Sequence, residues 1–166
     1  RFAWGSVLMS FLCVLAVFTE TLRTGAAREV VAYKWIFGGD LTINLAYLID
    51  PLTCIMLLVI TGVGFLIHVY SVGYMHGESG FTRFFVYMNL FMVSMLLLVM
   101  GNNYVVLFIG WEGVGLCSYL LIGYYYDKVS AAKAATKAFV VNRIGDAGFL
   151  LAIFLVFVNF RTLDYT

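Results

Sequence analysis

The sequence predicts an all-α bundle of about five transmembrane helices, with a short β-hairpin in its first loop. Three observations support this fold class: 63% of the 166 residues are hydrophobic, only 11% are charged, and there is a single proline. This composition lies far outside the range of water-soluble domains. Because lipid offers the backbone no hydrogen-bond partners, the apolar stretches that cross it must be helical. Residues 1–166 are therefore predicted to form one transmembrane region.

Five apolar stretches are long enough to cross a hydrocarbon core about 30 Å thick, which takes roughly 20 residues at 1.5 Å of rise each. The predicted spans are Phe2–Phe18, Leu48–Tyr70, Phe84–Met100, Tyr104–Tyr126 and Ala138–Phe160. No A-x-A cleavage pattern follows the first span, so it is not predicted to be a signal peptide, and the chain has the character of a piece of a longer protein. Lys and Arg are too evenly divided between the two sides to predict the orientation.

The loop at residues 19–47, between the first two spans, is the only sizeable one in the sequence. It contains two β-prone runs on either side of Gly38-Gly39, a pattern that predicts a hairpin at the membrane surface. The alternative is an irregular loop. Pro51 then falls in the first turn of the second helix, directly after Asp50, whose carboxylate we expect to cap that helix.

The later connections are short and polar. Little more than residues 101–103 joins the third and fourth spans, so these helices are predicted to be antiparallel neighbours. Asp127 or Ser130 is predicted to cap the fifth helix. Lys133 and Lys137 then lie four residues apart on one face of that helix, close enough to the bilayer surface to extend toward it.

Glu112 is an acidic residue inside the fourth apolar span. It lies about 12 Å from the nearer end of that span, at 1.5 Å per residue, where a charge costs about 3 kcal/mol on insertion scales. Burial favours the protonated form of a carboxyl group and a nearby cation favours the ionised form, so such a group can load and release a proton. Glu112 is therefore a candidate proton carrier. The alternative is a protonated glutamate that joins two helices by a hydrogen bond.

A second polar group, Asn142, Arg143 and Asp146, interrupts the fifth apolar span. Arg143 and Asp146 are three residues apart and can form an ion pair along one helix. Such a pair either takes part in transport or only lowers the cost of inserting both charges into lipid. If Arg143 instead points at Glu112 from the next helix, it would hold that carboxylate ionised. The sequence leaves both partners open.

Three further polar side chains lie in the second and third spans. His68 has a proton affinity suited to a relay, although a lone histidine near a helix end is more typical of an interfacial hydrogen-bonding group, which is the interpretation we favour. Asn89 and Ser94 are predicted to form hydrogen bonds between helices, with the lining of a water path as the alternative.

The sequence lacks the motifs of a soluble enzyme or a nucleic-acid-binding protein. The net charge of +1 argues against nucleic acid as a partner. There is no complete G-x-G-x-x-G, no P-loop and no Ser-His-Asp arrangement. Single cysteines without metal or disulfide spacing are interpreted as packing residues; they are Cys13, Cys54 and Cys117. We therefore expect no cofactor, no metal and no redox or hydrolytic chemistry in this chain, and membrane helices and lipid as its partners.

Four stretches, in this order, resemble the family of NADH-quinone oxidoreductase chain 5, the L subunit of respiratory complex I. They are DPLTCIMLLVITGVGFLIHVYSVGYM, RFFVYMNLFMVSMLLLVMGNN, LFIGWEGVGLCSYLLIGYYY and KAFVVNRIGDAGF. The resemblance runs from about Leu45 to Phe157, and WEGVGLCSYLLIG and NRIGD are its most specific motifs.

This resemblance implies an antiporter-like bundle with inverted repeats, which moves protons with energy from electron transfer elsewhere in the complex. NADH, FMN, iron–sulfur clusters and quinone are then expected in other subunits. The implied partners are the other membrane subunits of complex I, including neighbouring antiporter-like subunits, and the remainder of the same subunit. The implied location is an energy-transducing membrane, either a bacterial plasma membrane or a mitochondrial inner membrane.

The resemblance also implies roles for individual residues. Glu112 matches the family's essential membrane glutamate, which pairs with a lysine on a later helix, beyond Thr166. Arg143 and Asp146 match the charged pair of the following helix, and Lys137 matches its basic residue. The main alternative is the large subunit of a multisubunit Na⁺/H⁺ antiporter, which shares the glutamate helix. A third is a passive scaffold whose polar residues only hold the bundle together.

Overall fold

The structure, a computed structural model, describes residues 2–38 and 41–165, and within them five helices and one β-hairpin. All five helices are long and apolar enough to cross a membrane. The helices are α1 (Phe2–Thr24), α2 (Pro51–Tyr74), α3 (Phe81–Met100), α4 (Tyr104–Ile122) and α5 (Val129–Phe160). The predicted fold class is confirmed.

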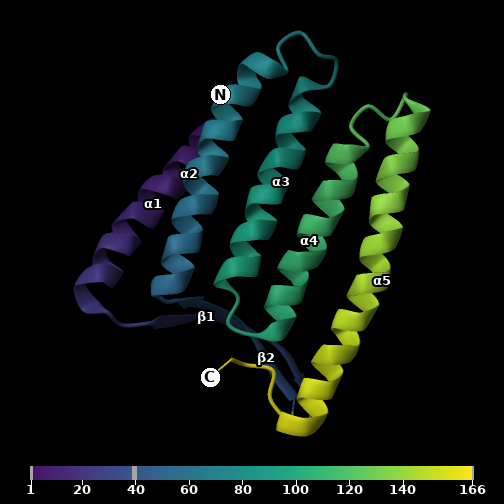
Figure 1. The fold of residues 1–166 in the computed structure, drawn as a ribbon. Helices are drawn as coiled ribbons and strands as arrows, with labels where there is room; N and C mark the ends of the chain where they lie inside the picture. The colour runs from purple at the N-terminus through teal and green to yellow at the C-terminus, as the bar shows by residue number, and fades with distance from the viewer. Residues whose placement is uncertain (1, 39–40, 166) are drawn as a thin grey trace.

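The helices run alternately in opposite directions, and each packs against the next one along the chain (Figure 1). α1 also contacts α3, so the first three helices all contact one another. α3 and α4 are antiparallel neighbours, as the short connection between them predicts. Most of the contacts between helices are therefore made by helices that follow one another in the sequence.

The hairpin lies across one end of the bundle, beneath α3 and α4 (Figure 1). Its strands, β1 (Arg28–Gly38) and β2 (Leu41–Ile49), are antiparallel, which confirms the predicted hairpin. Gly39, half of the predicted turn, lies outside the described residues. Every residue of β1 is exposed, whereas β2 contacts the helices and its backbone at Ala46 accepts a hydrogen bond of 3.1 Å from Asn102 N.

Side-chain caps begin two of the helices. Asp50 accepts a hydrogen bond of 2.6 Å from the backbone N–H of Thr53, with Pro51 in the first turn of α2, as predicted. Asn103 caps α4 in the same way, through a bond of 2.9 Å from Val106 N. Both caps satisfy backbone donors that the first turn of a helix leaves free.

The fifth helix begins where its cap candidates predict, well before the apolar span that starts at Ala138, but neither candidate is the cap. α5 begins at Val129, and its cap position is Lys128, with no side-chain bond. Asp127 therefore lies one residue too early to cap, and Ser130 already lies inside the helix. Hydropathy identified the apolar part of this helix but not its first turns, which contain alanine and lysine and extend the helix beyond the apolar span.

Glycines allow α3 and α4 to approach closely. A Cβ atom added at Gly110 would lie 2.5 Å from Leu98 Cα, and one added at Gly113 would lie 2.5 Å from Ser94 Oγ. Neither is a separation that real Cβ atoms adopt, so both positions require glycine at this spacing. The small residues beside Glu112 thus serve the close helix approach expected of them in a membrane bundle.

The predictions for the polar and cysteine side chains of the first three helices are only partly confirmed. Asn89 of α3 accepts a hydrogen bond of 3.1 Å from Ser6 of α1 and so links two helices, as expected. Ser94 instead donates to Leu90 O in its own helix. Cys54 is buried as a packing residue, whereas Cys13 is exposed, which corrects the prediction for that cysteine.

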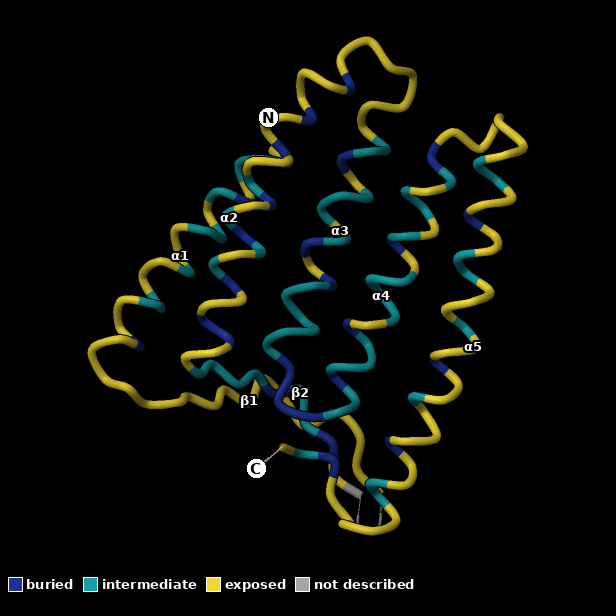
Figure 2. Tube along the Cα trace, viewed as in Figure 1, coloured by how far each residue is buried: buried dark blue, intermediate teal, exposed yellow. Residues whose placement is uncertain are grey.

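The buried core is thin, and most helix surfaces are exposed (Figure 2). Large apolar side chains such as Leu151, Phe154 and Leu155 of α5 are more than half exposed. A water-soluble protein rarely presents such a surface, so lipid or other membrane helices must cover it.

The last described residues return to the hairpin end of the bundle. The backbone N–H of Tyr165 donates a hydrogen bond to Asn102 O. Burial of the Tyr165 hydroxyl raises its pKa to about 12.

Candidate functional site

Glu112 and Arg143 face each other across the contact between α4 and α5. Arg143 Nη1 donates to Glu112 Oε2, and the same nitrogen lies 3.6 Å from Asp146 Oδ2. Both partners that the sequence left open for Arg143 are therefore engaged at once. One guanidinium bridges carboxylates from two helices.

The three charged side chains differ in exposure, with Asp146 the most buried and Arg143 the least. The side chain of Asp146 is 7% exposed, that of Glu112 24% and that of Arg143 41%. With both carboxylates ionised, the group has one positive and two negative charges. Such a group is costly in an apolar setting unless a proton or a further cation completes it. This imbalance makes the group responsive to a proton or to a movable positive charge.

Trp111, which precedes Glu112 in the sequence, forms a hydrogen bond with Asp146, the second carboxylate of this group. Its indole Nε1 donates a hydrogen bond of 2.9 Å to Asp146 Oδ1, and its ring packs edge-to-face against Phe149 of α5 at 5.8 Å. The sequence analysis missed this residue. An available signal was that a tryptophan N–H inside an apolar span needs an acceptor from a neighbouring helix.

A groove of about 620 Å³ lies between α4 and α5 beside these charges. Its polar lining comes from the side chains of Trp111, Ser118, Asn142 and Asp146. A water molecule takes about 30 Å³ of liquid volume and needs two to four polar partners, so the groove has room for water beside these four side chains, while the rest of its lining is apolar. In the described part of the chain, no cluster of His, Cys, Asp or Glu is arranged to hold a metal ion.

Two of the predicted site residues lie apart from this group. Lys137 is exposed on α5, and its six-residue separation from Arg143 places it on a different face of the helix. His68 is completely buried, and its Nδ1 lies 2.7 Å from Gly64 O. The description of His68 as an interfacial group near a helix end is wrong, because α2 continues to Tyr74.

Removing the N–H of Trp111 is expected to weaken the packing of α4 against α5. Trp111→Phe keeps an aromatic ring against Phe149 but leaves Asp146 without its indole donor. Hydrogen bonds to charged groups contribute about 1.5–3 kcal/mol, so we expect a fall of that order in the free energy of unfolding in detergent. Trp4→Phe in α1 is the matched control, since the structure shows no side-chain hydrogen bond from Trp4. Equal unfolding curves for the two variants would contradict the assignment.

Comparison with known proteins identifies the family. Residues 35–85 match the family model described as NADH-ubiquinone oxidoreductase (complex I), chain 5 N-terminus. Residues 101–166, which include the charged group, match the model described as NADH:quinone oxidoreductase/Mrp antiporter, TM. The chain belongs to the complex I chain 5 family. The family predicted from the motifs is thereby confirmed.

Similar proteins carry the name of the L subunit in this family. The chain is 56% identical to NADH-quinone oxidoreductase subunit L of Mycobacterium tuberculosis over 86% of its length, which is 23% of that relative. It is 50% identical to the Pseudomonas aeruginosa subunit L over 96% of its length, or 26% of the relative. The chain thus spans about a quarter of the length of these relatives.

Solved structures share the arrangement of helices. The Mrp complex from Dietzia sp. DQ12-45-1b contains a chain that superimposes with a TM-score of 0.80 at 27% identity, over 98% of the present chain and 17% of that one. The membrane-bound sulfane sulfur reductase, an archaeal respiratory membrane complex, gives 0.81 at 21% identity, over 98% of this chain and 32% of that one. The second likeness shows the fold alone. A bundle of this fold is therefore present in both of these membrane complexes.

Proposed function

We propose that the chain is part of a proton-translocating membrane subunit of an NADH:quinone oxidoreductase, and that Glu112 exchanges the proton. The supporting observation is the contact between Glu112 of α4 and Arg143 of α5 in the middle of two membrane helices. In this proposal the chain itself holds no redox group. NADH, FMN, iron–sulfur clusters and quinone belong to other subunits, and the electron transfer that they perform drives the proton.

Proton loading follows from the distance between Glu112 and a cation. A cation beside the carboxylate favours its ionised form, and withdrawal of the cation favours protonation. At an effective dielectric constant of about 20, a unit pair at 4 Å is worth about 4 kcal/mol, which corresponds to about three pH units of proton affinity. A movement from 4 Å to about 8 Å removes about half of this energy, which raises the proton affinity of Glu112 by about 1.5 pH units.

Asp146 offers Arg143 a second anionic partner during such a movement. It lies 3.6 Å from Arg143 Nη1 and is held in place by Trp111. The guanidinium therefore has a carboxylate to face when it leaves Glu112, which limits the cost of moving a charge inside the bundle. A lysine on a helix beyond Thr166 remains the predicted second cation.

The large subunit of a multisubunit Na⁺/H⁺ antiporter is the alternative function. Its support is the likeness to the Mrp complex at 27% identity. Identities of 50% and 56% to proteins named as subunit L favour the complex I function. The partners that follow are the other membrane subunits of such a complex and the lipid around it.

The test of this proposal is whether the carboxyl of Glu112 changes its protonation during turnover. In redox-triggered infrared difference spectra of the assembled complex, we expect wild type to show a protonated-carboxyl band that Glu112→Gln lacks. Glu78→Gln, which removes an exposed carboxylate in the loop between α2 and α3, is the matched control and should keep the band. Identical spectra for wild type and Glu112→Gln would refute proton exchange at this residue.

A further inference from the structure

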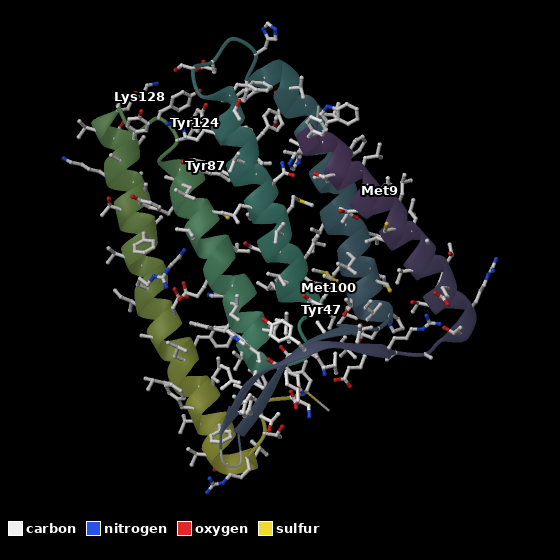
Figure 3. All side chains as sticks on the ribbon, turned by 180° about the vertical axis from the view of Figure 1, so that it is seen from behind. Met9, Tyr47, Tyr87, Met100, Tyr124 and Lys128 are labelled. Carbon is white, nitrogen blue, oxygen red and sulfur yellow. The ribbon has the colours of Figure 1, made fainter. Side chains whose placement is uncertain are left out.

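A second cavity, separate from the charged group, lies at the end of the bundle opposite the hairpin. It occupies about 240 Å³ where α3 begins, α4 ends and α5 begins. Figure 3 labels Tyr87, Tyr124 and Lys128 at this end of the molecule. We call it the Arg83 cavity; the residues of its lining used below are Arg83, Tyr87, Tyr124, Tyr126, Ala132 and Thr136.

Arg83 enters this cavity without an anionic partner. Its guanidinium carbon lies 5.1 Å from the ring centre of Tyr124 and 4.9 Å from that of Tyr126. One bond of 3.3 Å joins Nη2 to Tyr124 O, while Nε is buried and has no hydrogen-bond partner in the part of the chain that the structure describes. Within that part, no carboxylate lies close enough to the guanidinium to form an ion pair. Arg83 as a whole is partly exposed, but an unpaired buried Nε on a permanent cation is unfavourable, and an anion in this cavity would reach both the guanidinium and that nitrogen.

The position of the cavity at the ends of the helices indicates which anion is available to it. Arg83 is the third residue of α3, and Tyr124 and Tyr126 follow the last turn of α4. Tyrosines at helix ends mark the boundary between hydrocarbon and headgroups. The anions present at that boundary are lipid phosphates, and the planar fork of an arginine matches two phosphate oxygens.

The charge around the cavity also favours an anionic lipid over a neutral one. Described residues at this end of the bundle provide four cations against two carboxylates; the cations are Arg83, Lys128, Lys133 and Lys137, and the carboxylates are Glu78 and Asp127. Basic residues near the membrane surface attract anionic lipids. The net positive charge therefore adds attraction to the contacts inside the cavity.

We propose that the Arg83 cavity binds the phosphate group of an anionic phospholipid. Arg83 donates to the phosphate oxygens, the Thr136 side chain lies within the same lining, and the rings of Tyr124 and Tyr126 hold the guanidinium in place. The acyl chains then lie against the exposed apolar surface of the helices. This proposal does not depend on proton transfer at Glu112.

The experiment is a lipid titration of the purified membrane complex that contains this chain, followed by native mass spectrometry. Phosphatidylglycerol is the anionic probe and phosphatidylcholine the neutral one. We expect Arg83→Gln to weaken phosphatidylglycerol binding about tenfold or more. Ala132→Leu fills the cavity without changing its charge, so it should give a similar loss, and it provides a second measurement if Arg83→Gln fails to assemble.

Lys34→Gln is the matched control, because it removes one positive charge from an exposed residue of β1, in the hairpin at the opposite end of the bundle. Its phosphatidylglycerol binding should stay within about twofold of wild type, since an exposed charge is screened by salt. The proposal is wrong if Arg83→Gln and Ala132→Leu both bind like wild type, or if Lys34→Gln loses as much. Displacement of the lipid by an equal concentration of inorganic phosphate would assign the cavity to free phosphate instead. Loss of a neighbouring subunit with an unchanged lipid count would assign it to an acidic protein segment.

Discussion

Glu112→Gln is expected to abolish proton translocation through this subunit while the assembled complex continues to transfer electrons at its other sites. Glutamine has nearly the same shape as glutamate, and its amide oxygen can still accept a hydrogen bond from Arg143, but it has no proton to exchange. A positioned proton-transfer group contributes about 100- to 10,000-fold in rate, so we expect a loss of at least about 100-fold in transfer through this path. The measurement is the number of protons translocated per electron in sealed vesicles.

Glu20→Gln is the matched control for this prediction. Glu20 also forms an ion pair with an arginine, Arg28 at 2.8 Å, but both side chains are more than half exposed at the hairpin end of the bundle. Its replacement should leave the proton-to-electron ratio unchanged. If Glu112→Gln and Glu112→Ala both pumped like wild type, the polar residues of α4 and α5 would serve only as a scaffold.

Gly110→Ala is expected to be the most destabilising single-methyl change in the contact between α3 and α4. The added Cβ would meet backbone atoms of Leu98, which cannot rotate away as a side chain can. Overpacking of this kind costs about 1–3 kcal/mol, and more where the helices must separate. The measurement is the free energy of unfolding in detergent micelles, together with the amount of complex that assembles in the membrane.

Gly115→Ala, on the same helix, is the control for this steric prediction. Its Cβ would lie 3.5 Å from Asn142 Nδ2, which is an ordinary contact, and alanine favours helix over glycine by about 1 kcal/mol. We therefore expect this variant to be as stable as wild type or slightly more stable. Similar losses in the two variants would mean that helix flexibility, and not the approach to Leu98, determines the need for glycine.

The fold was predictable because hydropathy and helix length are properties of the sequence alone. The five spans and the hairpin follow from composition, span length and the β-prone runs of the first loop. The start of α5 was not predictable in this way, because the segment from Val129 to Lys137 is helical without being strongly apolar. His68 was misplaced for a related reason, since α2 continues beyond its apolar part to Tyr74.

The site was predictable residue by residue but not as an arrangement. The depth of Glu112 in its span was sufficient to single it out, and the three-residue spacing suggested the contact of Arg143 with Asp146. Whether Arg143 also reaches Glu112 depends on how α5 is rotated against α4, which helical periodicity along one chain segment does not determine. The bond from Trp111 to Asp146 depends on the same rotation.

The unequal spacing of the helices gives the bundle a mechanical asymmetry. Gly110 and Gly113 let α3 and α4 approach each other closely, so these two helices form a closely packed pair. α5, which contains Arg143, contacts α4 beside the groove of about 620 Å³. A displacement of α5 relative to α4 would therefore carry the guanidinium with it, while Glu112 would stay with the closely packed pair of α3 and α4.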